Sequence, residues 1–529
     1  MNKSTLLIFF LSIGNLLNAQ FVPTNQKRIG GYDNDELIRF YNPNDLSYSY
    51  LIGSSLSPAG GHKTENGYGG HDIWIVKLSA SGTKIWDKTI GGYGEDYFAD
   101  AVITDEAIFI GVSSLSNLGG NKTVSSNGDY DAWLIKMDHQ GTITHQNSYG
   151  GDQYESLSGM SIEGNQLILL CSSSSGLSGN KTSGNYGGSD VWILQIDTTD
   201  LSIDAQHHWG SPLNEGPNGL EKIGANYFIA CLSETGTGND KTETGYGLND
   251  IWLLKTDLNF NLLENKCFGG SETEYPEDMC QLNGELFITT SSYSNTGGSK
   301  TQDNFGSIDE YPKTDCWILK VDPVSMNLVW DLSFGGTDND VESGITVLDN
   351  NRMIISIHTR SAQNTGNISS PSYGLYDAKY LVIDSEANML TQFSMGGSGY
   401  DYCQVSLVDN GVVYFSGYSN SDISGNKTVG TIGGLDAWLC QTTLATLGVD
   451  EFGKEPLLSI YPNPGKEYIY VSGDGFNHQT RGNITDLKGT HLKSFDYDTF
   501  MESPIYIGDL PSGVYFLEVN GAVSRFVRE

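Results

Sequence analysis

A short element that pairs Asp with Trp recurs along this chain at nearly constant spacing, and it limits the fold more than any other feature. Asp, one variable residue and Trp occur six times, and a seventh copy keeps the Asp but has Lys379 where Trp should be. Successive Asp residues lie 59, 59, 60, 65, 62 and 59 positions apart. A period of this length indicates seven copies of one supersecondary unit. The copies are Asp72 and Trp74, Asp131 and Trp133, Asp190 and Trp192, Asp250 and Trp252, Asp315 and Trp317, Asp377 alone, and Asp436 and Trp438.

Each unit is predicted to form four short β-strands. In the second unit, alternation of apolar and polar residues between turn residues places strands near 97–104, 107–114, 131–138 and 143–149. The 65 glycines, 29 tyrosines and 9 tryptophans of the 529-residue chain fit an all-β protein of short strands and tight turns. Four strands per unit, repeated radially, are the signature of a β-propeller.

The two ends of the repeat region predict how the ring closes. The seventh unit stops after its third strand, whereas the segment before the first Gly-Gly, residues 21–31, has the pattern of a fourth strand. An N-terminal strand that completes the last blade would remove the exposed sheet edges. We therefore predict a seven-bladed propeller over residues 20–446, followed by a linker at 447–457 and a small β-sandwich at 458–529.

The first 19 residues have the pattern of a secretory signal peptide. Lys3 precedes an apolar stretch from Leu6 to Leu17, which is too short to span a bilayer, and Ala19 offers a cleavage point. No later segment is apolar for long enough to form a transmembrane helix. The formal charge of −35 disfavours nucleic acid and anionic membranes as partners. Cys171 and Cys231 fall at one strand position, which favours buried small side chains over a disulfide framework.

A Lys nine residues before the repeated Asp could belong to a repeated active site or to a repeated scaffold. It recurs in six units, with an insertion that makes the spacing fifteen in the fifth; the sixth unit has Ile368 there. A catalytic site requires a unique, asymmetric set of groups, which six copies around a ring do not supply. The pattern therefore favours a loop-closing contact within each blade. These residues are Lys63, Lys122, Lys181, Lys241, Lys300 and Lys427.

A second repeated charge lies four residues after each Gly-Gly. Trp209-Gly210 is taken as the remnant of this pair in the fourth unit, which assigns Asn214 to the position. The carboxylates could ring one mouth of the central channel and hold a hard cation such as calcium. The alternative, which we favour, is that they accept hydrogen bonds from backbone donors at a turn. The acids are Asp35, Asp96, Glu155, Glu274, Asp340 and Asp401.

No catalytic or metal-ligating motif is found. The nine histidines have neither H-E-x-x-H spacing nor the repeat period, and G-x-S-x-G, P-loop and C-x-x-C motifs are absent from the sequence. The repeated Trp is expected to pack between blades, the alternative being a platform for sugar rings. We therefore predict no catalytic residues, no metal ligands and no cofactor, and the sequence assigns no ligand-binding residue.

The C-terminal segment carries four motifs in order. They are "YPNP" (Tyr461, Pro462, Asn463 and Pro464), "ITDLKGTHL" with Gly489, "LPSGVYFLEV" with Gly513 and Tyr515, and the end "SRFVRE". This segment of about 72 residues resembles the type A sorting domain of cargo of the Bacteroidetes type IX secretion system. The resemblance implies the type IX machinery as a partner, and release or anchoring at the cell surface. The propeller repeats resemble glycine-rich repeats of such surface proteins.

These observations favour a secreted or surface-displayed propeller that binds an extracellular glycan or protein without catalysis. The loops that carry the Lys are expected to form one broad face, and the irregular fifth and sixth units, with residues 302–314 and 367–380, are where a specific site is expected. One alternative is an extracellular polysaccharide-degrading hydrolase or lyase, for which His207, His208, Glu310 and Tyr311 are the candidates. The other is a structural component of a surface layer.

Overall fold

The computed structural model describes residues 21–42, 48–306, 313–447, 459–461, 463–472, 480–486, 490–497, 504–519 and 522–529. The predicted signal peptide, Pro462, Gly489, Glu310 and Tyr311 lie outside these residues. The chain divides into two compact units, residues 1–448 and 449–529.

The first unit is a seven-bladed β-propeller. Each blade is a four-stranded antiparallel sheet, and blades 1 to 6 take their strands in chain order, beginning with β2–β3–β4–β5. The strands observed in the second unit of the repeat, 96–103, 108–114, 131–137 and 143–149, agree with the predicted ones to within one residue. The first three blades are β2 (Asp35–Tyr41), β3 (Tyr48–Ser55), β4 (Asp72–Ser79) and β5 (Lys84–Ile90); β6 (Asp96–Ile103), β7 (Ile108–Ser114), β8 (Asp131–Met137) and β9 (Ile143–Tyr149); and β10 (Glu155–Glu163), β11 (Gln166–Ser173), β12 (Asp190–Asp197) and β13 (Ile203–Trp209).

The remaining blades repeat this plan. Blades 4, 5 and 6 are β14 (Glu215–Ile223), β15 (Asn226–Glu234), β16 (Asn249–Asp257) and β17 (Leu262–Phe268); β18 (Glu274–Leu282), β19 (Glu285–Ser292), β20 (Asp315–Val321) and β21 (Leu328–Phe334); and β22 (Asp340–Val347), β23 (Arg352–Thr359), β24 (Asp377–Asp384) and β25 (Met389–Met395). Blade 7 is β26 (Asp401–Asp409), β27 (Val412–Ser419), β28 (Asp436–Thr443) and the N-terminal β1 (Thr24–Ile29).

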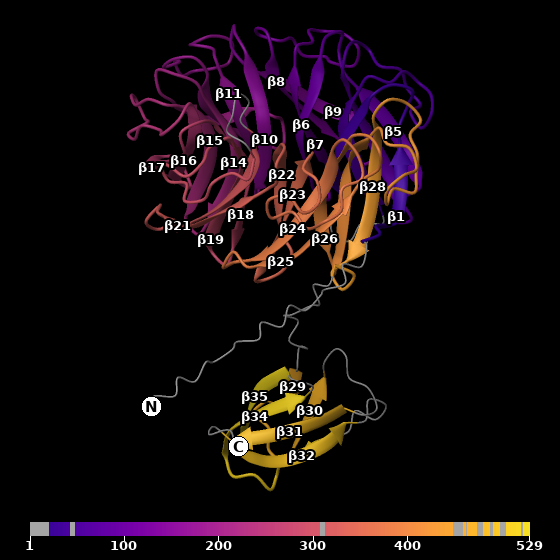
Figure 1. The fold of residues 1–529 in the computed structure, drawn as a ribbon, viewed down its shortest axis with the longest axis vertical. Helices are drawn as coiled ribbons and strands as arrows, with labels where there is room; N and C mark the ends of the chain where they lie inside the picture. The colour runs from indigo at the N-terminus through magenta and orange to yellow at the C-terminus, as the bar shows by residue number, and fades with distance from the viewer. Residues whose placement is uncertain are drawn as a thin grey trace, which may run out of the picture. The chain divides into compact units, whose positions relative to one another are not determined.

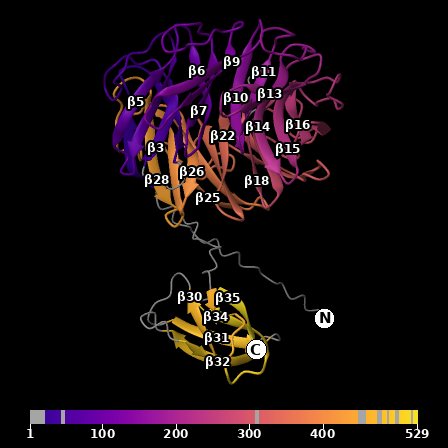
Figure 2. The ribbon, with the colours of Figure 1, turned by 180° about the vertical axis from the view of Figure 1, so that it is seen from behind.

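The first strand of each blade lies at the centre of the ring. These strands contact their counterparts in the neighbouring blades, as β10 does with β6 and β14. Figure 1 shows β10, β14, β18 and β22 inside the ring and β17, β21 and β25 at its edge, and Figure 2 shows the same arrangement from behind. Each central strand has a β-bulge in its middle, for example between Leu37 and Arg39, which sharpens its twist.

The ring closes as predicted. β1 pairs antiparallel with β28, so that Arg28 lies opposite Trp438, and it supplies the fourth strand of blade 7. On the other side of the seam, β2 of blade 1 contacts β26, β27 and β28. Blade 7 therefore unites the two ends of the repeat region.

The repeated Trp side chains fill the seams between blades. Each is at most 1% exposed. Trp192 of blade 3 packs with Phe109 and Leu134 of blade 2, and Trp74 of blade 1 packs with Ala437 and Leu439 of blade 7. A large aromatic side chain at such a seam buries much apolar area, and only blade 6, with Lys379, lacks the Trp. The repeat thus specifies the contacts between blades as well as the blades themselves.

The second unit consists of two small sheets that enclose one core. The sheets have the orders β29–β30–β33 and β32–β31–β34–β35, and Ile469, Ile484, Leu517 and Phe526 meet between them. The strands are β29 (Ser459–Tyr461), β30 (Tyr468–Ser472), β31 (Thr480–Asp486), β32 (His491–Tyr497), β33 (Ile505–Tyr506), β34 (Gly513–Val519) and β35 (Ala522–Arg528).

Candidate functional site

The repeated Lys is a buried part of the scaffold. Lys122 is 2% exposed, and its ammonium donates to Ser114 Oγ and to the Ser116 carbonyl, both at 2.7 Å. Ser114 in turn donates to Asp96. Burial lowers the pKa of Lys122 to about 8. The contact that closes the loop therefore runs from Lys through a serine to the acid of the innermost strand.

The serine was missed at the level of sequence, although a signal for it exists. A Ser stands eight residues before each of the six Lys residues and accepts a hydrogen bond from its ammonium. These serines are Ser55, Ser114, Ser173, Ser233, Ser292 and Ser419.

Blade 6 supplies the same charge from another position. Ile368 replaces the loop Lys and is 2% exposed, while Lys379 occupies the position of Trp and is 1% exposed. The Lys379 ammonium donates at 3.0 Å to the Ser370 and Pro371 carbonyls and to Ser372 Oγ. Ser372 donates to the Ser361 carbonyl. The corresponding serine of blade 2, Ser126, donates to the Ser116 carbonyl and contacts the Lys122 ammonium. Ile368 and Lys379 therefore compensate each other, since the ammonium lost from the loop is supplied from the position of the Trp.

The acids after the Gly-Gly pairs accept hydrogen bonds from the turn. Asp35 accepts from the Gly31 N–H at 2.5 Å and from Ser55 Oγ at 2.5 Å, and it is fully buried. Burial raises the pKa of Asp35, and its hydrogen bonds oppose this. The carboxylates have the backbone contacts of the favoured interpretation and do not form an exposed ring at the channel mouth.

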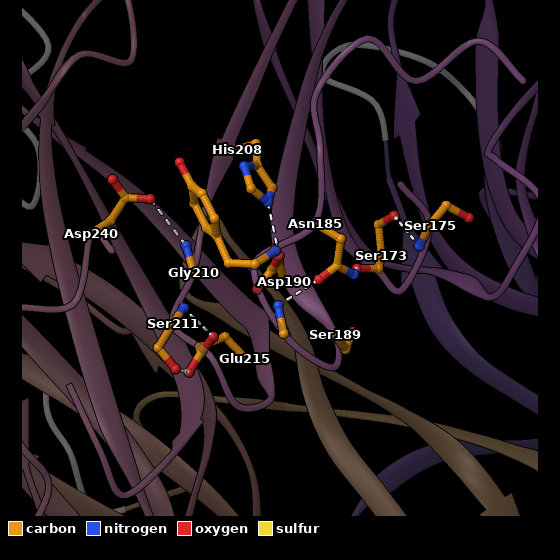
Figure 3. Close-up of polar contacts among 12 residues, drawn as sticks. Ser173, Ser175, Asn185, Ser189, Asp190, His208, Gly210, Ser211, Glu215 and Asp240 are labelled. Carbon is orange, nitrogen blue, oxygen red and sulfur yellow. Dashed lines mark hydrogen bonds and ion pairs between the residues drawn. The ribbon is translucent and has the colours of Figure 1, made fainter. Parts of the chain in front are cut away.

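The assignment of Asn214 to this set is wrong. The Ser211 N–H donates to Glu215 Oε2 at 2.8 Å, and Ser211 Oγ donates to Glu215 Oε1 at 2.5 Å (Figure 3). Gly210 and Ser211 therefore take the places of the two glycines, with Glu215 as the acid. Asn214 instead accepts from the Ser189 N–H. The serine at the second glycine position hid this register in the sequence.

The Asp of each Asp-x-Trp element holds the loop that precedes it. Asp72 Oδ2 accepts from the Tyr68 N–H at 2.7 Å, and the equivalent contact recurs in every blade. The other oxygen, Oδ1, faces the first glycine of the next unit, where a Cβ on Gly91 would lie 1.7 Å from it. Burial raises the pKa of Asp72 to about 6. The repeated glycine is therefore required by the close approach of a carboxylate.

One seam departs from the repeat through a histidine between two acids. His208 Nε2 lies 2.9 Å from Asp190 Oδ2 (Figure 3), where blade 2 has Ser148 bound to Asp131. Asp240 accepts from the Gly210 N–H at 3.2 Å, at the position that is Asn in four other units, which have Asn121, Asn180, Asn367 and Asn426. Burial raises the pKa of Asp240, and the nearby His208 opposes this shift. The His208 side chain is only 7% exposed, so this pair is largely shielded from a substrate.

Two of the four proposed enzymatic candidates lie away from the channel. His207 and His208 lie on β13, the outermost strand of blade 3. His207 contacts Gln195 Oε1 at 3.2 Å and packs against Phe260. Within the described ranges, no three His, Cys, Asp or Glu side chains are placed to hold a metal ion. The seven cysteines are buried free thiols.

Tyrosines gather where the innermost strands begin, beside the channel mouth. A first ladder of rings runs from His71 through Tyr97 and Tyr130 to Tyr154, with centroid separations of 4.8, 6.3 and 5.4 Å. Tyr97 and Tyr154 are 39% and 43% exposed. The ladder crosses blades 1 to 3 on the face that carries the repeated loops.

A second ladder occupies the same level of blades 5 to 7. Tyr376 stacks on Tyr400 and Tyr402, and Tyr402 contacts Tyr418, at 5.2–5.8 Å. Tyr275 contacts Tyr293 at 6.4 Å. Tyr275 and Tyr400 are 40% and 38% exposed.

Glu36 of β2 joins the two ladders. Glu36 is the second residue of β2, as Tyr97 is of β6 and Tyr402 is of β26, so it has the same level in blade 1, between blades 7 and 2. Burial and the Glu36 carboxylate raise the pKa of Tyr418. Burial, Tyr275 and Tyr376 together raise the pKa of Tyr293. We call this set, from Tyr154 through Glu36 to Tyr275, the tyrosine arc. Its members occupy equivalent positions in only some of the units, as Tyr97, Tyr275 and Tyr402 do at the second residue of β6, β18 and β26, and so the repeat did not reveal it.

The C-terminal unit brings its motifs to the last strand. Asn463 donates to the Arg525 carbonyl at 3.0 Å and accepts from the Val527 N–H at 2.9 Å. Tyr515 is 6% exposed, stacks on Phe526, and donates from its hydroxyl to the Pro511 carbonyl at 2.6 Å. The described motif residues therefore fix β35 and the turn before β34.

Comparison with known proteins identifies this unit. Residues 459–528 match the family described as "Secretion system C-terminal sorting domain". The chain is thus a protein exported to the medium or the cell surface by the type IX system, whose machinery the sorting domain engages. It joins this domain to a seven-bladed propeller. The described residues include no helix that is long and apolar enough to span a membrane.

Solved structures of several kinds share a distant likeness with the chain. The Pan2 WD40 domain of Neurospora crassa is 9% identical, with a TM-score of 0.41, over 80% of this chain and 97% of that chain. Quinohemoprotein alcohol dehydrogenase from Comamonas testosteroni is 10% identical, with a TM-score of 0.39, over 78% and 76%. The endosialidase of phage phi92 is 10% identical, with a TM-score of 0.39, over 80% and 69%. Such values carry no information on activity. No curated protein matches the sequence.

Proposed function

We propose that the exported protein is a non-catalytic binding module for an extracellular glycan or protein. The observation that carries this proposal is that the repeated charged groups are buried and hydrogen-bonded within the scaffold. Lys122, Asp96 and Asp131 are at most 2% exposed. The side chains that break the repeat and remain accessible on the loop face are mainly tyrosines.

A binding surface of this kind suits tyrosine. Its ring offers a large, rigid contact area at a low cost in conformational entropy, and its hydroxyl can donate and accept hydrogen bonds. Four tyrosines of the arc are 38–43% exposed, so they are available to a ligand. Propellers host many activities, and the fold alone does not decide between binding and catalysis.

The alternative function is that of a polysaccharide-degrading enzyme. The observation that favours it is the His208–Asp190 pair, which only one blade has among the described residues. His208→Ser would restore the residue that blade 2 has at this position. An enzyme that uses the pair would lose its activity in this variant, whereas a binding module would keep its ligand.

The test is a glycan array probed with the purified propeller, residues 20–446, and with the longer chain, residues 20–529, with and without chelator. Both bound sugars and shortened products are measured. Saturable binding without cleavage is the expected result. Product formation would overturn the proposal in favour of the enzyme. A propeller that binds neither glycans nor extracellular proteins would instead support a structural surface-layer component.

A further inference from the structure

We propose that the tyrosine arc is a binding site for a neutral glycan chain, which would lie along the ladders beside the channel mouth. This inference rests on the proposed binding function and specifies its ligand class and position. The residues that carry it are exposed rings at the start of the innermost strands, chiefly Tyr97, Tyr154, Tyr275 and Tyr400.

The geometry of the first ladder fits a chain of linked sugar rings. His71, Tyr97, Tyr130 and Tyr154 follow each other at 4.8–6.3 Å, a step comparable with the length of one pyranose residue. Neighbouring rings of the ladder cover part of each other's faces, at interplanar angles of 25–60°, so the exposed ring edges and hydroxyls are the parts that would meet the C–H groups and hydroxyls of a pyranose. Successive rings could therefore contact successive sugars.

The acids of the arc disfavour anionic chains, and the cation over Tyr376, Arg360, lies 3.9 Å from Asp338. Glu36 lies between the two ladders, at the strand position that Tyr97 and Tyr402 have in the neighbouring blades, and Glu95 lies beside Tyr97. Glu95 also binds His71 at 2.8 Å and keeps 36% of its side chain exposed. The chain as a whole has a formal charge of −35. Sulfated or uronate-rich polysaccharides would be repelled, and a neutral glycan would not.

The arc has an open end that limits where the ligand can lie. At the level of Tyr97 and Tyr275, blade 4 has Gly216 as the second residue of β14. Asn214 precedes that strand, where Tyr154 precedes β10. The aromatic surface therefore runs through blades 3, 2, 1, 7, 6 and 5 and stops at blade 4. We expect a linear chain to follow this path.

The experiment compares two neutral probes, a soluble β-glucan and a galactomannan, with two anionic ones, alginate and a sulfated galactan. Binding to the chain of residues 20–529 is measured by titration calorimetry at low and high salt. The test variant is Tyr97→Ala with Tyr154→Ala. The control is Tyr93→Ala, since this ring is 71% exposed on the same face and packs over Gly119 away from the ladder. Thermal unfolding of each variant reports whether the fold is kept.

We expect saturable, salt-independent binding to a neutral probe that falls by about tenfold or more in the double variant and is unchanged in Tyr93→Ala. Neutral binding that survives in the double variant would overturn the arc as the site and leave the binding function standing. Binding to anionic probes or to a protein alone would overturn the neutral glycan. Shortened products, or no ligand of any class, would overturn the proposed function as well. A double variant that unfolds is replaced by Tyr97→Gln with Tyr154→Gln, to which the same outcomes apply.

Discussion

Exchanging two residues of blade 2 for those of blade 6 tests whether each blade needs a buried ammonium at one place. Lys122→Ile alone removes the cation from Asp96 and Asp131, which are both fully buried. Loss of one partner from a buried charged cluster costs about 3–5 kcal/mol of unfolding free energy. Trp133→Lys alone removes a large seam side chain, which costs about 3–5 kcal/mol, and places a second ammonium beside Lys122.

The double variant should be much less unstable than the sum of these losses. In blade 6, Ile368 and Lys379 already form this arrangement, and the Lys379 ammonium lies beside Ser372 as Lys122 lies beside Ser126. We expect a coupling energy of at least about 2 kcal/mol between the two sites. It is measured from the urea midpoints of the wild type, the two single variants and the double variant, with unchanged dependence on urea.

The matched control is Lys88→Met, because Lys88 forms an exposed pair with Glu65 at 2.8 Å, and such pairs contribute less than about 1 kcal/mol. Additive losses in the double variant would refute the reasoning, since they would mean that the two lysines do not serve the same cluster. A loss in Lys122→Ile no larger than that in the control would show that the buried acids do not need a cation.

Three further predictions concern pH, a glycine and export. Burial raises the folded-state pKa values of Asp72, Asp250 and Asp377 to about 6 and of Asp315 to about 7. Because the folded state then binds more protons than the unfolded state, the free energy of unfolding should fall as the pH rises from about 5 to 7.5. A urea midpoint that rises over this range would contradict the assignment. Gly91→Ala should destabilise the propeller by about 1–3 kcal/mol or more because its Cβ would meet Asp72 Oδ1, whereas Gly184→Ala, with no atom within 4 Å of its Cβ, should have little effect on the thermal midpoint. Asn463→Ala should reduce the exported fraction in a host with the type IX system because β35 loses two hydrogen bonds. Lys466→Ala, at a side chain that is 81% exposed, should leave export unchanged. Equal export of the two variants would show that Asn463 is not needed for sorting.

The sequence predicted the propeller because the repeat is both a local and a global signal. A four-stranded unit cannot bury both of its faces alone, so the Trp on its third strand needs a neighbouring blade, and the unfinished seventh unit needs β1. The same periodicity failed at Asn214, because Ser211 in the place of glycine shifted the apparent register by one residue. It also could not show that Ile368 and Lys379 compensate each other, since that depends on where two side chains of different length meet.

The tyrosine arc follows the repeat only in part. Tyr97 is the second residue of β6, Tyr130 precedes β8, Tyr154 precedes β10, and Tyr293 follows β19. Tyr97 is equivalent to Tyr275 and Tyr402, and Tyr154 to Tyr400, but each position holds a tyrosine in only some of the blades, and closure of the ring brings them to one level. The repeat specifies a scaffold, and the departures from it gather into a surface only in three dimensions.

Closure through β1 also determines when the propeller can be complete. Thr24 donates to the Gln441 carbonyl across 417 positions of sequence, so the strand made first joins a partner made almost last. Long-range pairing of this kind slows folding, although the entropic cost of closing so large a loop grows only with the logarithm of its length. Until β28 is available, β1 has no partner strand and blade 7 cannot be completed. Protection from aggregation is therefore needed for the whole time between the arrival of the first blade and that of the last.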